Sequence, residues 1–172
     1  MNVFMTSGTL EFMERLREKH ASETMFILHG EGNVLLLHET NGKTVFQTPR
    51  RYEVLGSAGN FEENGFFVFY NIPVSDEGRP VFEHNFKERA NAFDAEPGFI
   101  AFRLLRPHKS DTYIILMEWS DNRYYTLWKT TSSFEQNHLT NPVEAGANSV
   151  VNLFSGAPSI TTYMSKEKNE DA

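Results

Sequence analysis

The spacing of apolar residues predicts strands and helices along the whole chain. In the first third, apolar residues recur at helical spacing over residues 9–20. Two short apolar runs, at 24–30 and 33–40, are typical of strands. The dipeptide Asn41-Gly42 then favours a tight hairpin turn, so we expect a further strand over 43–48.

The second part of the chain gives a clearer pattern. We expect a strand over 65–74, a helix over 78–93, strands over 99–107 and 112–119, a helical region over 121–139 capped by Asp121, and β structure over 150–154 and 160–164. The order β-α-β-β-α-β is that of the split βαβ or ferredoxin-like fold, in which one antiparallel sheet is covered by helices. The class is therefore α+β.

The first part resembles the second in element order only. It offers a possible edge strand, a helix and two strands, and residues 49–64 read as a connection. We therefore expect a βαββ-like extension over residues 1–64, a ferredoxin-like domain over 65–165 and a frayed acidic tail over 166–172.

Composition narrows the classes of function. The 172 residues include 15 Phe, 6 Tyr and 2 Trp, and this aromatic content suits a flat apolar ligand cavity. The formal net charge of −7, with residues 50–52 (RRY) as the densest basic spot, argues against a nucleic-acid partner. The absence of Cys excludes disulfides and thiol catalysis. With no signal-peptide pattern and no apolar run of about 20 residues, we expect a cytoplasmic protein without a membrane span.

Trp128 and His138 are the first candidates for chemistry. Ten residues on one straight helix correspond to about 1000° of rotation, which leaves the two side chains about 80° from a common face. A break at 130–133 (TTSS) would let them approach the same cavity. His138 is either a surface histidine or a metal ligand, and a single protein ligand suffices only when a cofactor, usually heme, completes the coordination. Trp128 is either a packing residue or a wall of that site.

Asn71 interrupts an apolar strand pattern, VFYNIPV. Asn is depleted in strands, and a buried carboxamide needs hydrogen-bond partners. It either caps the strand before Pro73 or donates a hydrogen bond into a pocket.

These residues carry a resemblance to a known family. From residue 65 to about 165 the chain resembles the IsdG-type heme-degrading monooxygenases of the antibiotic biosynthesis monooxygenase superfamily. The resemblance rests on Asn71 in VFYNIPV, Trp128 in YYTLWKT and His138 in FEQNHL, and on the segments GRPVFE, EPGFIAFRLLRP and TYIILMEW. The whole chain is similar to the two-part members found in Gram-positive bacteria.

The resemblance implies a role for each residue. His138 would bind the heme iron, Trp128 would press on the macrocycle, and Asn71 would donate a hydrogen bond on the oxygen side. Phe86 and Arg89, on the helix over 78–93, would contact the heme. Heme would then be both substrate and cofactor, and a reductase or other external donor would supply electrons. Because the N-terminal strands would replace a second subunit, the resemblance also implies a monomer.

Two other functions stay open. One is a non-catalytic heme-binding or regulatory relative of the same fold, since some staphylococcal two-part relatives are described as signalling proteins and lack the strand Asn. Retention of Asn71 favours the catalytic branch. The other is a cofactorless quinone-forming monooxygenase, which would not need His138.

Overall fold

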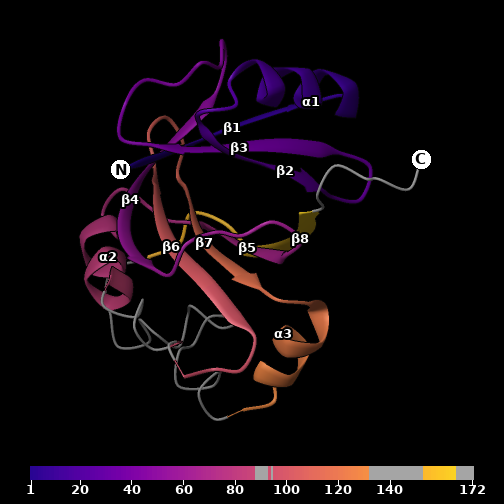
Figure 1. Ribbon diagram of the computed structural model, residues 1–172. Helices are drawn as coiled ribbons and strands as arrows, with labels where there is room; N and C mark the ends of the chain where they lie inside the picture. Colours follow the sequence, from indigo (N-terminus) through magenta and orange to yellow (C-terminus); the bar gives the residue numbers. More distant parts are fainter. Residues whose placement is uncertain (88–92, 94, 132–152, 166–172) are drawn as a thin grey trace.

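Eight antiparallel strands close into a barrel with helices on its outside (Figure 1). The computed structural model describes residues 1–87, 93, 95–131 and 153–165. The strands are β1 (Asn2–Gly8), β2 (Thr24–His29), β3 (Val34–Thr40), β4 (Arg50–Ala58), β5 (Phe66–Pro73), β6 (Phe99–Pro107), β7 (Thr112–Trp119) and β8 (Ser159–Ser165). The helices are α1 (Leu10–Lys19), α2 (Arg79–Lys87) and α3 (Asn122–Trp128). Around the barrel the order is β1-β3-β2-β8-β5-β7-β6-β4.

The barrel consists of two halves with the same strand order. The C-terminal half runs β8-β5-β7-β6 and the N-terminal half runs β4-β1-β3-β2. Numbered within each half, both are 4-1-3-2, the order of a split βαβ sheet. The halves meet at two equivalent seams, β4 with β6 and β2 with β8. The ferredoxin-like fold and the pseudo-dimeric arrangement are thereby confirmed.

The N-terminal half is more complete than the sequence pattern predicts. Residues 43–48 form no strand, so the predicted hairpin is wrong. Residues 43–48 cannot pair with β3, because β3 already pairs with β1 on one side and with β2 on the other and has no free edge. The fourth strand is β4, which was expected to be a connection and instead bonds to both β1 and β6. The expected edge strand, β1, lies inside the sheet.

Apolar side chains form three clusters, separated by the wall of the barrel. One fills the interior with residues from β1 to β7. A second packs α2 and α3 against the outer face of β5, β6 and β7, and a third packs α1 against the outer face of the N-terminal half. Strands β5, β6 and β7 are thus buried on both faces, which explains the continuous apolar run of β7.

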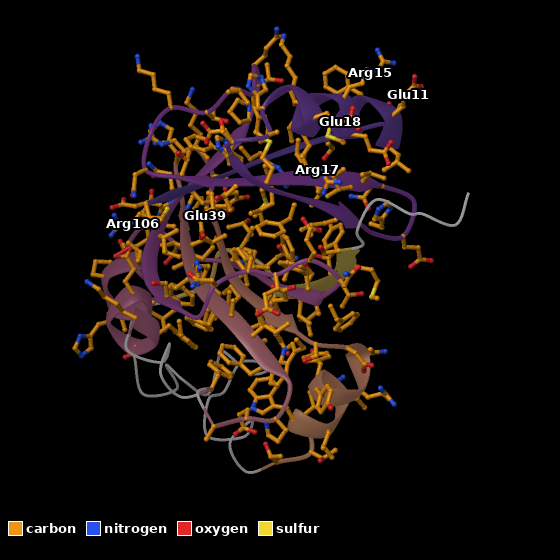
Figure 2. All side chains as sticks on the ribbon, viewed as in Figure 1. Glu11, Arg15, Arg17, Glu18, Glu39 and Arg106 are labelled. Carbon is orange, nitrogen blue, oxygen red and sulfur yellow. The ribbon has the colours of Figure 1, made fainter. Side chains whose placement is uncertain are left out.

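A buried ion pair ties the halves together inside the barrel. Arg103 on β6 donates from Nε to Glu39 on β3 at 2.7 Å. Its Nη1 donates to the carbonyl oxygens of Ala58, Gly59 and Phe102. Figure 2 shows Glu39 among the strands, whereas the charged side chains labelled on α1 lie at the surface of the N-terminal half.

Of the helices in the described ranges, none has the length and apolar character that a membrane span requires.

Candidate functional site

Helix α3 places Trp128 against the sheet. The helix begins after Asp121, whose Oδ1 accepts a hydrogen bond from the backbone N–H of Arg123 at 2.7 Å, so the expected cap is confirmed. Trp128 is the last residue of the helix and is only 2% exposed. Its indole packs on the outer face of the C-terminal half.

An aromatic wall surrounds this indole. The ring centroid of Trp128 lies 5.3 Å from that of Phe93, 5.3 Å from that of Trp119 and 6.3 Å from that of Tyr125. Trp119 is fully buried, and within the described part of the chain its Nε1 has no hydrogen-bond partner. These uncharged aromatic side chains hold the indole of Trp128 in place from several sides.

Two tyrosine hydroxyls supply a polar feature on the same face. The Oη atoms of Tyr70, on β5, and Tyr125, on α3, lie 2.7 Å apart and are buried. Burial raises the pKa of both hydroxyls, so both stay protonated at neutral pH. Two hydroxyls carry two protons and their mutual bond uses one, so the second proton can be donated to another group.

Asn71 lies on the other face of β5. Successive side chains of a strand point to opposite faces, and Tyr70 and Ile72 belong to the outer cluster that contains Trp128. Asn71 instead donates from Nδ2 to Thr161 Oγ1 at 3.1 Å, on the side of Phe69 in the barrel interior. The structure therefore does not bring Asn71 and Trp128 together. It brings Tyr70 to that face, a residue that the period-two pattern of the strand could have identified.

The remaining candidates divide between described and undescribed residues. Phe86 on α2 is buried in the outer cluster, with its ring 4.8 Å from that of Phe82. His138 and Arg89 lie outside the described residues. Over the described ranges, no three His, Cys, Asp or Glu side chains are grouped so that they could hold a metal ion.

Comparisons with known proteins agree with this geometry at the level of fold. Residues 65–138 match the family model described as antibiotic biosynthesis monooxygenase. The chain is 26% identical to the signal transduction protein TRAP of Staphylococcus epidermidis over 137 residues, which are 80% of this chain and 82% of the relative.

Two solved structures share the architecture over nearly the whole length. A major regulator of staphylococcal pathogenesis superposes with a TM-score of 0.82 at 24% identity, covering 95% of this chain and 98% of that one. LmHde, a heme-degrading enzyme from Listeria monocytogenes, superposes with a TM-score of 0.73 at 22% identity, covering 95% of this chain and 99% of that one. At these identities the likeness shows the fold alone.

Proposed function

We propose that this chain, in which residues 65–138 match the family model described as antibiotic biosynthesis monooxygenase, is a heme-degrading monooxygenase. The observation that carries the proposal is the buried indole of Trp128 in an uncharged aromatic wall on the outer face of the domain. His138 follows ten residues later, within the matched segment. The fold shared with LmHde is consistent with the same chemistry.

In this proposal heme is the substrate and also supplies the iron at which dioxygen reacts, while an external reductant, such as a reductase, provides electrons. His138 binds the iron, and Trp128 presses on one face of the macrocycle. An indole can deform a ring only if it is itself held in place, and the contacts of Trp128 with Phe93, Trp119 and Tyr125 meet that requirement. Phe86 and Arg89 are proposed contacts from the first helix of the domain.

We assign the hydrogen bond on the oxygen side to the hydroxyl pair of Tyr70 and Tyr125. Asn71 was the candidate from the family resemblance, but its side chain points into the barrel and is bonded to Thr161. The tyrosine pair lies on the face of Trp128, is neutral and retains one proton for donation. A donor fixed in a site that excludes water stabilises developing negative charge without reorganisation.

The first prediction concerns heme turnover. Hemin added to the protein should give a Soret band, and ascorbate under air with catalase present should bleach this band and release iron. His138→Ala should lose the spectrum of histidine-ligated ferric heme, because it removes the proposed iron ligand. Absorption spectroscopy with a ferrous-iron chelator measures both effects. Heme binding without bleaching or iron release would refute the proposed enzymatic activity. An unchanged ferric spectrum in His138→Ala would refute the assignment of His138 as the iron ligand.

The second prediction separates Tyr70 from Asn71. Tyr70→Phe should bind hemin but bleach it more slowly, on the order of a hundredfold, because one fixed donor is lost. Asn71→Ala should bleach hemin at close to the original rate, since its side chain faces the barrel interior. Single-turnover kinetics on the preformed heme complex measure both rates. The reverse result, with a slow Asn71→Ala and an unchanged Tyr70→Phe, would restore the role of Asn71.

A non-catalytic heme-binding or regulatory protein is the alternative. It is favoured by the 26% identity to TRAP over 80% of the chain. The turnover experiment decides between the two, because a regulator would bind hemin without degrading it.

We also propose that the protein is a monomer. The seams β4–β6 and β2–β8 close the barrel within one chain, so the N-terminal half takes the place that a second subunit would fill.

A further inference from the structure

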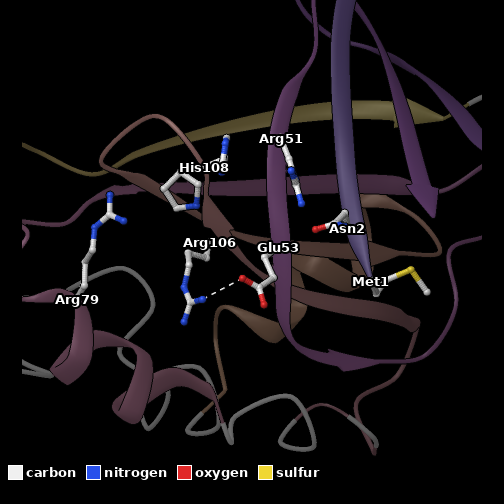
Figure 3. Close-up of a pocket in the computed structure, with 8 residues that line it drawn as sticks. Met1, Asn2, Arg51, Glu53, Arg79, Arg106 and His108 are labelled. Atoms are coloured by element: carbon white, nitrogen blue, oxygen red, sulfur yellow. Dashed lines mark hydrogen bonds and ion pairs between the residues drawn. The ribbon is translucent and has the colours of Figure 1, made fainter. Parts of the chain in front are cut away.

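A polar cavity lies where the two halves of the barrel meet at the β4–β6 seam (Figure 3). It has a volume of about 490 Å³ and is built from the start of β1, from β4, from the first residue of α2 and from the end of β6. The lining residues are Met1, Asn2, Arg51, Glu53, Arg79, Arg106, Pro107 and His108. Three arginines and one glutamate therefore line the same cavity.

Arg106 is neutralised within the protein and serves as a fixed support. Its Nε and Nη2 donate to the two carboxylate oxygens of Glu83 at 2.6 and 2.9 Å, and its Nη1 donates to Glu53 at 2.9 Å. The bidentate bond from Arg106 also lowers the pKa of Glu83, so this carboxylate stays ionised. The network holds α2, β4 and β6 in place around the cavity.

Arg51 and Arg79 keep their charge available. Within the described residues Arg51 forms no ion pair. Arg79 donates from Nη2 to the carbonyl oxygen of Ser110 at 2.6 Å. Its one ion pair among the described residues is a 3.7 Å contact with Asp76, whose side chain is 98% exposed, and screening by water weakens such a contact. The Nε of Arg79 is buried and, in the described part of the chain, has no hydrogen-bond partner. A buried guanidinium N–H without an acceptor is a site at which an anionic ligand can gain a bond.

A second cavity extends the positive surface. It has a volume of about 410 Å³, shares Arg51, Pro107 and His108 with the first, and adds Arg50 and Lys109. Arg50 and Arg51 form the densest basic spot of a chain whose formal net charge is −7. A cleft lined by one sign of charge concentrates ions of the opposite sign, even on a protein of opposite net charge.

This surface is separate from the proposed heme site. Phe99, at the start of β6, packs against Trp119 in the wall around Trp128, with ring centroids 5.7 Å apart. Arg106 lies near the other end of β6, about 20 Å further along the strand. A ligand in the cavity therefore does not replace heme at the aromatic wall.

We infer that this cavity binds a small molecule carrying a phosphate or pyrophosphate group. The planar fork of Arg matches phosphate oxygens in two-bond geometry, and two arginines that line one cavity can hold two adjacent phosphates. The volume lies within the range of small-molecule sites. The inference does not depend on heme degradation.

The third prediction tests this site in the full-length protein. Isothermal titration calorimetry with pyrophosphate at low salt should show saturable binding. The double variant Arg51→Ala/Arg79→Ala should weaken it by about tenfold or more, because two charge-assisted contacts are lost. Arg51→Ala alone should show part of the loss. This single variant leaves the ion pairs of Arg106 in place, and also the hydrogen bond from Arg79 to the Ser110 carbonyl.

Arg15→Ala is the matched control. Arg15 lies on α1 in an exposed ion pair with Glu11, so its removal changes the net charge equally without touching the cavity. If Arg15→Ala and Arg51→Ala weakened pyrophosphate binding equally, only the net charge of the protein would matter. The proposed site would then be wrong. Citrate binding as tightly as pyrophosphate at the same ionic strength would overturn the assignment to phosphate.

Discussion

Replacing Arg103 with Met should lower the free energy of unfolding by about 3–5 kcal/mol, because it leaves a buried carboxylate without its partner. The side chains of Arg103 and Glu39 are 5% and 11% exposed, so water cannot replace the lost ion pair. The carbonyl oxygens of Ala58, Gly59 and Phe102 lose a donor as well. Urea denaturation followed by circular dichroism measures the change.

Two further variants locate the cause of this loss. Arg15→Met removes an exposed arginine from a surface ion pair and should change stability by less than about 0.5 kcal/mol. The double variant Arg103→Met/Glu39→Gln should recover part of the loss, since no buried charge then remains. A double variant no more stable than Arg103→Met would show that lost packing, rather than the isolated charge, causes the destabilisation.

Glu118→Gln should flatten the dependence of stability on pH. Glu118 is fully buried in the barrel wall, and burial raises the pKa of its carboxyl to about 8, with the nearby charges of Glu62 and Glu63 acting in the same direction. The backbone N–H of Glu62, which donates to Oε1 at 2.7 Å, and the charge of Arg103 only partly offset this. Among the described residues, Oε2 has no partner.

Stability falls as the pH rises, because the folded state retains a proton that the unfolded chain releases. Below the ordinary glutamate pKa of 4.5, the folded and the unfolded chains both hold this proton. The contribution of Glu118 to stability is then fully present. As the pH rises from there to about 8, the unfolded chain releases the proton and the folded chain keeps it, so stability falls. We expect a loss on the order of 3 kcal/mol over this range, most of it absent in Glu118→Gln.

Urea midpoints measured at about pH 5 and at about pH 8.5 test this expectation. Glu11→Gln, a change at an exposed glutamate, is the control and should follow the original protein at both values. Parallel pH profiles for Glu118→Gln and the original protein would show that Glu118 does not retain a proton in the folded state.

Local patterns predicted most of the elements, because their residues carry the periodicity themselves. The strands β5, β6 and β7 and the helix α1 lie close to their predicted ranges. Strand β4 was missed because Arg50, Arg51, Glu53 and Gly56 give it little apolar alternation. Its place is set by the neighbours β1 and β6, which lie far apart in the sequence and determine where the chain can pair.

The candidate site was predicted in part, for a similar reason. Trp128 was a candidate from the sequence pattern, the resemblance gave it a role, and the structure places it on a buried aromatic face. Asn71 stood out as a carboxamide in an apolar strand, but the residue type does not say to which face it points. The register of the strand decides to which face a side chain points. Val68, Tyr70 and Ile72 alternate along β5 and belong to the outer cluster, so Tyr70 points to the outer face. The role of His138 stays a prediction, since the residue lies outside the described ranges.

The internal pseudo-symmetry of the barrel has a consequence for its charged residues. Glu39 and Glu118 occupy equivalent places, each next to last in the third strand of its half and each opposite the second residue of the first strand. In a homodimer, every substitution would appear on both sides of the axis. A single chain that holds both halves is free of that restriction: Glu39 pairs with Arg103, whereas burial keeps Glu118 a neutral acid.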